Sequence, residues 1–149
     1  MDGTVDVSEK DRSFRRATAQ CVLVASERTV RAIRENDLPK SDPLPTARAA
    51  GLLAAKRTPD LLPHCHPISL TEVTFDFEFG TDSVTVRCRV SVCERTGPEM
   101  EALCGASTAA LTLYDMIKGV CRGAHIERTM VLEKEGGKSG HWRREGENS

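Results

Sequence analysis

Residues 69–97, SLTEVTFDFEFGTDSVTVRCRVSVCERTG, decide the fold of this chain. Two runs within them alternate polar with apolar side chains, and the turn-forming residues 80–83 lie between the runs. A period of two on either side of a short turn that contains glycine, aspartate and serine is typical of a β-hairpin. The sequence therefore predicts two antiparallel strands joined by this turn.

The segment that follows the hairpin predicts the longest helix of the chain. Residues 97–118, GPEMEALCGASTAALTLYDMIK, are rich in alanine, leucine and methionine, which favour helices. Thr96 and Glu99 stand at the spacing of a capping box, and Pro98 falls in the first turn, where its missing N–H costs little. We expect this helix to run to about Arg122, just before a glycine.

The remaining segments complete an alternating pattern of strands and helices. The sequence predicts a strand over residues 13–26, a helix over 27–36 capped by Ser26, a proline-rich loop over 37–45, a helix over 47–57 opened by Thr46, at most a short helical turn over 58–67, and a last strand over 125–135. The order β-α-α-β-β-α-β predicts an α+β fold, ferredoxin-like, with a mainly antiparallel sheet and helices packed on one face. We expect a single domain over residues 1–149, with a flexible polar tail over 141–149.

The composition limits the partners and the compartment. The formal net charge is −1, so no long-range attraction to nucleic acid or to an acidic membrane surface is expected. The chain has no apolar run near the roughly 20 residues that a membrane helix needs, and its start is too polar for a signal peptide. We therefore expect a cytoplasmic protein without nucleic-acid or membrane partners, whose six cysteines are reduced.

Charged residues at both ends of the long helix need an explanation. Glu101, Thr108 and Asp115 recur every seven residues and share a polar stripe, and Asp115 lies one turn from Lys118. Glu101 and Asp115 are about 21 Å apart along the helix axis, too far for one pocket within a single subunit. If both ends serve one pocket, a second chain must supply the other end, which predicts an oligomer. The alternative is a solvated stripe with a surface salt bridge worth under about 1 kcal/mol.

Three further stretches carry groups that suit chemistry. Lys56 and Arg57 end a predicted helix, either to bind an anion or only to neutralise the helix C-terminus. Residues 64–66, His-Cys-His, offer a histidine for proton transfer or ligand binding, or part of a metal site without obvious further ligands. Lys138 lies in a glycine-rich segment that lacks the full phosphate-loop pattern. The Lys138 ammonium group either binds an anionic ligand or belongs to a disordered linker.

Several stretches together resemble one known family. They are VDVSEK (5–10), ARAAGLLAAKRT (47–58), LLPHCHPISLTEV (61–73), RTGPEMEALCGASTAALTLYDMIKGV (95–120) and LEKEGGKSG (132–140). Over nearly the whole chain, the sequence is similar to the molybdenum cofactor biosynthesis protein C family, the cyclic pyranopterin monophosphate synthases. These motifs are long, ordered and specific.

The resemblance implies a lyase with a ferredoxin-like subunit, assembled as a homohexamer (a trimer of dimers) with its active site between subunits. It implies conversion of 3′,8-cyclo-7,8-dihydroguanosine 5′-triphosphate to cyclic pyranopterin monophosphate, with release of pyrophosphate, in molybdenum cofactor biosynthesis. A partner radical enzyme makes this cyclised nucleotide from GTP. No cofactor and no protein metal site are expected, although Mg²⁺ can accompany the pyrophosphate.

The resemblance also assigns roles to individual residues. Asp115 and Lys118 of YDMIK are the expected pair for acid and base catalysis. Clustered cations would meet the triphosphate, and the histidine and glutamates would orient the purine-derived part. The expected substrate-binding residues are Lys56, Arg57, His66, Glu99, Glu101, Lys138 and the early arginine, Arg15. The chain departs from the family pattern at Pro98, at His64 and in loop 39–44, yet every expected catalytic residue is present.

Two other interpretations stay open at this point. The chain could be an oligomeric module that binds a nucleotide without catalysis, which an assay for the pterin product would distinguish. It could also be a structural metalloprotein that uses His64, Cys65, His66 and other cysteines. Metal analysis of the purified protein would decide that case.

Overall fold

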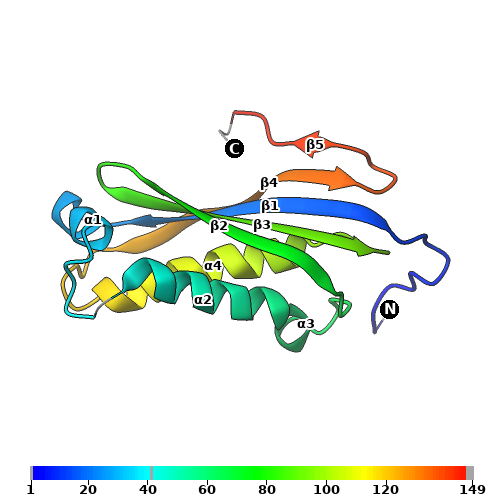
Figure 1. Cartoon of the computed structure of the whole chain (residues 1–149), viewed down its shortest axis with the longest axis horizontal. Coiled ribbons are helices and arrows are strands. Elements are labelled where there is room, and N and C mark those ends of the chain that lie inside the picture. Colours follow the sequence, from blue (N-terminus) through cyan, green and yellow to red (C-terminus); the bar gives the residue numbers. More distant parts are fainter. Residues whose placement is uncertain (1, 41, 147–149) are drawn as a thin grey trace.

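The computed structural model describes residues 2–40 and 42–146 and shows a sheet with helices packed beneath it (Figure 1). In chain order the elements are β1 (Ser13–Val24), α1 (Glu27–Arg34), α2 (Pro43–Lys56), α3 (Thr58–Leu61), β2 (Leu70–Phe79), β3 (Ser83–Glu94), α4 (Glu99–Ile117), β4 (His125–Gly136) and β5 (Trp142–Arg143). The strands form one antiparallel sheet in the order β2-β3-β1-β4-β5. This confirms the predicted α+β fold and fits a ferredoxin-like arrangement.

The β2–β3 hairpin forms as its alternation predicts. Phe79 pairs with Val84, and the Gly80 N–H donates to the Ser83 carbonyl oxygen at 2.9 Å, which closes the turn. Alternate side chains of β3 are completely buried, namely Val84, Val86, Cys88, Val90 and Val92. The sheet therefore has one apolar face toward the helices and one polar face.

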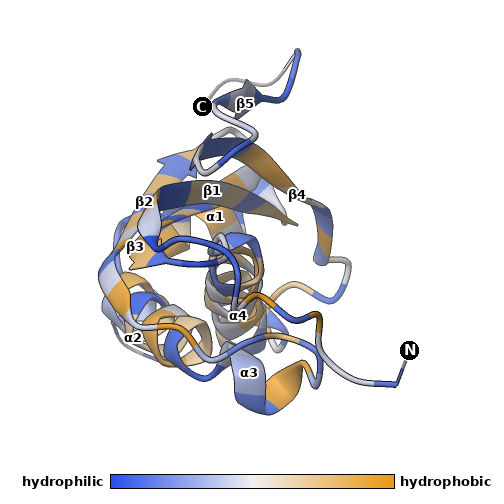
Figure 2. Cartoon of the chain, turned by 90° about the vertical axis from the view of Figure 1, so that its right-hand side faces the viewer, coloured by the Kyte–Doolittle hydropathy of each residue, from blue (hydrophilic) through white to orange (hydrophobic). Residues whose placement is uncertain are grey.

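Helices α2 and α4 lie against the apolar face of the sheet (Figure 2). Alanines allow α4 to approach the strands closely, because a small side chain keeps the two backbones near each other. The completely buried residues of α4 include Ala102, Ala106, Ala109, Ala110, Leu113 and Ile117. This packing holds α4 rigidly and so fixes where its two ends lie.

The helices α2 and α4 cross at a pair of glycines. A Cβ atom added at Gly51 would stand 2.6 Å from the Phe75 ring and 2.8 Å from the Gly105 carbonyl oxygen. A Cβ atom added at Gly105 would stand 2.7 Å from the Cys88 sulfur. These distances are too short for non-bonded atoms, so the crossing requires glycine at both positions.

Substitution of Gly51 by alanine is expected to destabilise the fold by about 1 to 3 kcal/mol, because the methyl group overpacks the crossing. In a helix free of such contacts, the same change would stabilise by roughly 0.5 to 1 kcal/mol. Gly119→Ala is the matched control, since a Cβ atom there meets nothing within 4 Å. Urea denaturation measures the free energy of unfolding of both variants. Equal stabilities would contradict the claim that the helix crossing leaves no room for a side chain at Gly51.

The ends of α1 and α4 test the predictions from capping patterns. Ser26 caps α1 as expected, because its Oγ accepts from the Thr29 N–H at 3.1 Å. The capping box predicted at the start of α4 is wrong, and Pro98 precedes the helix without a side-chain cap. The Glu99 carboxylate contacts Lys134 Nζ at 2.8 Å.

Two predicted helix boundaries are also wrong. Helix α4 ends at Ile117 rather than near Arg122, because the chain turns there to enter β4. The N–H groups of Val120 and Cys121 both donate to the Ile117 carbonyl oxygen in this turn. Helix α2 begins at Pro43, inside the predicted loop, since prolines are tolerated in a first helical turn.

The short strand β5 was not expected from the sequence. Trp142 pairs with Lys134 and thereby returns the chain along the edge of β4. Gly136 at the end of β4 and Gly137 and Gly140 in the loop that follows take positive φ angles, which suits glycine. The flexibility of residues 141–149 stays a prediction, and residues 147–149 lie outside the described residues. In the described part of the chain, every helix is too short or too polar to cross a lipid bilayer.

Candidate active site

The two helices beneath the sheet run in opposite directions (Figure 1). The C-terminal end of α2, with Lys56 and Arg57, therefore lies at the same end of the molecule as the start of α4, with Glu99 and Glu101. Asp115 lies at the far end of α4. We call these regions the α4 N-terminal end and the α4 C-terminal end.

At the α4 C-terminal end, Asp115 accepts hydrogen bonds from two lysines. Lys118 Nζ lies 2.7 Å from Asp115 Oδ1, and Lys40 Nζ lies 3.3 Å from Oδ2. The hydrogen bond from Lys118, assisted by Lys40, lowers the pKa of Asp115. The same hydrogen bond raises the pKa of Lys118, so both groups are held in their charged forms. All three side chains are more than half exposed in the single chain.

At the α4 N-terminal end, Glu101 is buried. Only 1% of its surface is exposed, and its Oε2 accepts a hydrogen bond from the Cys65 thiol at 3.5 Å. Its Oε1 is buried without a hydrogen-bond partner among the described residues. Burial raises the pKa of Glu101, and burial together with the Glu101 charge raises the pKa of Cys65 to about 12. The protein therefore favours a neutral carboxyl group beside a neutral thiol.

The raised pKa of Glu101 predicts a pH dependence of stability. Because the folded-state pKa lies above the unfolded value of 4.5, the folded state resists ionisation of this group. The free energy of unfolding is therefore expected to fall as pH rises from 4.5 through the folded-state pKa. Glu101→Gln should remove this loss, so its stability relative to wild type should improve between pH 5 and 8.

Urea denaturation of both proteins across about pH 5 to 8 measures this difference. Glu27→Gln is the control, since the Glu27 side chain is 65% exposed in a surface pair with Arg31. Parallel stability curves for wild type and Glu101→Gln would contradict the buried neutral carboxyl group.

A cavity of about 710 Å³ lies between the start of α4 and the β4–β5 loop. Its lining includes two predicted site residues, Arg15 and Glu99, together with Lys134. Arg15 Nε donates to the Glu94 carbonyl oxygen at 3.1 Å, and its guanidinium group lies against Gly137. The cavity thus has both cationic and acidic side chains in its walls, close to the glycine-rich loop.

The histidine segment meets the N-terminal part of the chain. The Gly3 carbonyl oxygen lies 2.8 Å from His64 Nδ1 and accepts its hydrogen bond. His66 is half-buried, and its charge helps to lower the pKa of Asp6 after the dominant effect of a backbone hydrogen bond from Ser8. In the described residues His64, Cys65 and His66 do not form a cluster of three metal ligands, so the metalloprotein interpretation gains no support there.

Comparison with known proteins identifies the family of the chain. The model of the MoaC family matches residues 4–137. The chain belongs to the MoaC family. A cyclic pyranopterin monophosphate synthase of Streptomyces avermitilis is 49% identical over 94% of this chain and 82% of its own length. Cyclic pyranopterin monophosphate synthase 2 of Mycobacterium tuberculosis is 50% identical over 94% of this chain and 84% of its own length. The cyclic pyranopterin monophosphate synthase of Pelobacter propionicus is 49% identical over 95% of this chain and 89% of its own length.

In this MoaC-family chain the predicted site residues divide between the two ends of α4. Asp115 and Lys118 contact each other at the C-terminal end. The others lie toward the opposite end: Glu99 and Arg15 share a cavity, Glu101 contacts Cys65 beside His66, and Lys56, Arg57 and Lys138 are exposed. One chain therefore does not bring the whole set together.

Three residues that contact the predicted MoaC site were missed from the sequence. Lys40 contacts Asp115, Lys134 contacts Glu99, and Cys65 contacts Glu101. Lys40 is 75 residues from Asp115, and no local pattern marks such a pairing. Lys134 could have been found, because strand alternation separates it from Glu133 and Glu135 and turns it toward the helices.

Proposed function

We propose that this chain is a cyclic pyranopterin monophosphate synthase, a lyase of molybdenum cofactor biosynthesis. It converts 3′,8-cyclo-7,8-dihydroguanosine 5′-triphosphate to cyclic pyranopterin monophosphate and releases pyrophosphate. Synthases that are about half identical to the chain support the reaction. The observation that carries the site is the Asp115–Lys118 pair, whose charged groups lie 2.7 Å apart and accessible at a helix end.

The substrate carries a triphosphate, which needs several cations. In our proposal Lys56, Arg57 and Lys138 bind the phosphates, because ammonium and guanidinium groups form strong charge-assisted hydrogen bonds with phosphate oxygens. All three are exposed and available in the single chain. Arg15 adds a further cation beside the glycine-rich loop. The net charge of −1 permits this, since a local cluster suffices.

The reaction opens one ring, forms another and closes a cyclic phosphate, so protons must be moved. We assign proton acceptance to the Asp115 carboxylate and proton donation to the Lys118 ammonium group, which already lie within hydrogen-bonding distance of each other. His66 and Glu99 orient the purine-derived part. In our proposal Glu101, which is buried and accepts a hydrogen bond from Cys65 in the single chain, also orients the purine-derived part.

Both ends of α4 serve one reaction in this proposal. Because they lie about 21 Å apart along the helix, the active site must combine the N-terminal end of one chain with the C-terminal end of another. The proposed assembly is a homohexamer, a trimer of dimers. It acts in the cytoplasm after the radical enzyme that makes its substrate. No cofactor is proposed, and Mg²⁺ would enter only with the pyrophosphate.

The direct test is a coupled assay with the radical enzyme that supplies the cyclised nucleotide. Formation of cyclic pyranopterin monophosphate together with an equal amount of pyrophosphate supports the proposal. Binding of the nucleotide without either product would instead support a module that holds a nucleotide without catalysis.

A further inference from the structure

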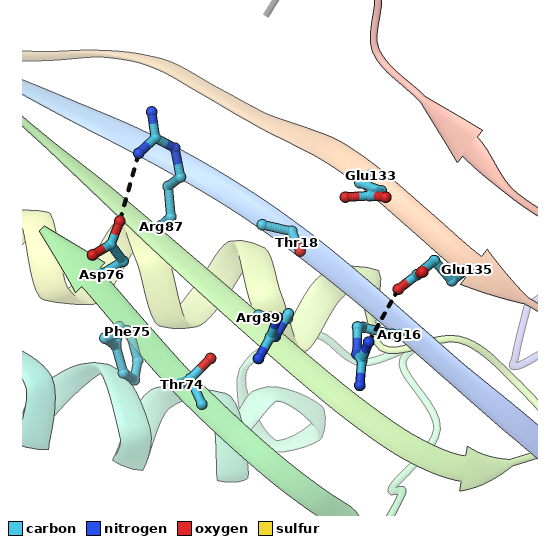
Figure 3. Close-up of a pocket in the computed structure, with 9 residues that line it drawn as sticks. All are labelled: Arg16, Thr18, Thr74, Phe75, Asp76, Arg87, Arg89, Glu133 and Glu135. Atoms are coloured by element: carbon cyan, nitrogen blue, oxygen red, sulfur yellow. Dashed lines mark hydrogen bonds and ion pairs between the residues drawn. The ribbon is translucent and has the colours of Figure 1, made fainter. Parts of the chain in front are cut away.

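The polar face of the sheet carries a group of possible metal ligands beside the cavity that Arg15 and Glu99 line, and two of them, Glu135 and His141, also line that cavity. Glu133 and Glu135 lie two residues apart on β4 and point to the same face, as Figure 3 shows. His141, from the segment that leads into β5, lies beside them, with its Nε2 at 2.6 Å from Glu133 Oε1. One ligand atom from each of the three residues lies within 4.8 Å of the other two.

We propose that Glu133, Glu135 and His141 bind a divalent transition-metal ion, with Zn²⁺ as the best fit. Imidazole nitrogen and carboxylate oxygen are both zinc ligands, at about 2.0 to 2.2 Å. In a tetrahedral site such ligand atoms stand roughly 3.3 Å apart, so small side-chain rotations from the present positions are enough. The fourth position would hold water.

Two of the three proposed ligands are carboxylates, which attract a cation. Two carboxylates and a histidine face one point, and Glu133 is only 22% exposed, which limits its solvation. Arginines share this face of the sheet and compete with the ion: Arg16 Nη1 lies 3.4 Å from Glu135 Oε2, and Arg143 stands opposite Glu133 in the strand register. Arg16 also donates to Ser91 Oγ, so it can keep a partner when the ion engages Glu135.

The ion would link two segments that the chain otherwise joins weakly. Strand β5 has only two residues and pairs with β4 through the register of Trp142 with Lys134 and of Arg143 with Glu133. A metal bridge from β4 to His141 would anchor both ends of the glycine-rich loop that carries Lys138. The consequence for Lys138 rests on the proposed function, whereas metal binding itself does not.

The chain contains a built-in reporter for this site. Trp142 is the only tryptophan of the protein and follows His141 directly. A Co²⁺ ion bound by His141 is expected to quench the fluorescence of Trp142. A paramagnetic ion held by the neighbouring residue shortens the lifetime of the excited indole. Zn²⁺ should then compete with Co²⁺ and restore the emission.

The experiment titrates the full chain with Co²⁺ and then with Zn²⁺. We expect saturable quenching with one ion per chain, and at least about a tenfold higher midpoint for Glu133→Gln and for His141→Ala. His125→Ala is the matched control, because His125 contacts a single carboxylate, that of Glu127 at 3.1 Å, and should leave the midpoint unchanged. Far-ultraviolet circular dichroism checks that each variant is folded.

Three results would overturn the proposal. The first is the absence of saturable quenching by Co²⁺. The second is a midpoint that neither ligand variant changes. The third is a thiolate-to-cobalt charge-transfer band, which would place the ion on cysteine sulfur instead of on carboxylate and imidazole. None of these results depends on enzymatic activity, so they leave the proposed function untouched.

Discussion

Lys118→Ala is expected to abolish formation of cyclic pyranopterin monophosphate while the fold stays intact. The variant removes the proposed proton donor, and such a loss typically lowers turnover by about 10² to 10⁴-fold. The side chain is 60% exposed and contacts the exposed carboxylate of Asp115, so little folding stability depends on it. The coupled assay measures turnover, and thermal denaturation checks the fold.

Arg89→Ala is the control for Lys118→Ala. It removes another exposed ion pair, with Glu72 at 3.4 Å, on the polar face of the sheet and away from both ends of α4. This control should keep near-normal turnover. The companion variant Asp115→Asn should lose activity by a similar factor, and the double variant should be little worse than either single one, because the two groups act as a unit. Turnover of Lys118→Ala within about threefold of wild type would show that the pair is an ordinary surface salt bridge.

Lys56→Ala is expected to weaken substrate binding more than it slows the chemical step. A hydrogen bond to a charged group is worth about 1.5 to 3 kcal/mol, so KM should rise by roughly 10 to 150-fold. Lys56 ends α2 with an exposed side chain, and its loss should leave the helix folded. Steady-state kinetics with the cyclised nucleotide separate the change in KM from the change in kcat.

Ionic strength gives a second readout for Lys56. Binding through phosphate contacts weakens with added salt, so wild type should lose affinity more steeply than Lys56→Ala. The Arg89→Ala control should follow wild type. If Lys56→Ala lowered kcat without changing KM or the salt dependence, the lysine would act in chemistry rather than in phosphate binding.

The period of the hydrophobic pattern predicted the hairpin and the order of the elements, because burial on one face leaves a regular signature. Helix ends were less predictable. The Thr96–Glu99 capping box failed because the helix begins at Glu99, so Pro98 and not Thr96 holds the N-cap position. Helix α4 stopped at Ile117 because the sheet requires the chain to turn back for β4. At the end of α4 the course of the chain in the tertiary fold overrode a local preference.

The sequence predicted which residues form the polar stripe of α4, but it did not predict which of them are exposed to solvent. Residues seven apart drift by about 20° per heptad, so Glu101 and Asp115 are turned by roughly 40° relative to each other. Glu101 is buried against Cys65, whereas 54% of the Asp115 side chain is exposed. A spacing rule places residues on a face, but only the packing of α2, α3 and the sheet decides which part of that face is covered.

The central claim is that each active site joins the N-terminal end of α4 from one chain to the C-terminal end of α4 from another. Co-expression of Lys56→Ala chains with Lys118→Ala chains, followed by purification of the mixed assembly, tests it most directly. The assay uses substrate well below the raised KM of Lys56→Ala, where each variant alone is nearly inactive. With equal mixing, about one quarter of the shared pockets would contain both intact lysines, so roughly one quarter of wild-type activity should return. Mixed assemblies as inactive as either variant alone would contradict the claim.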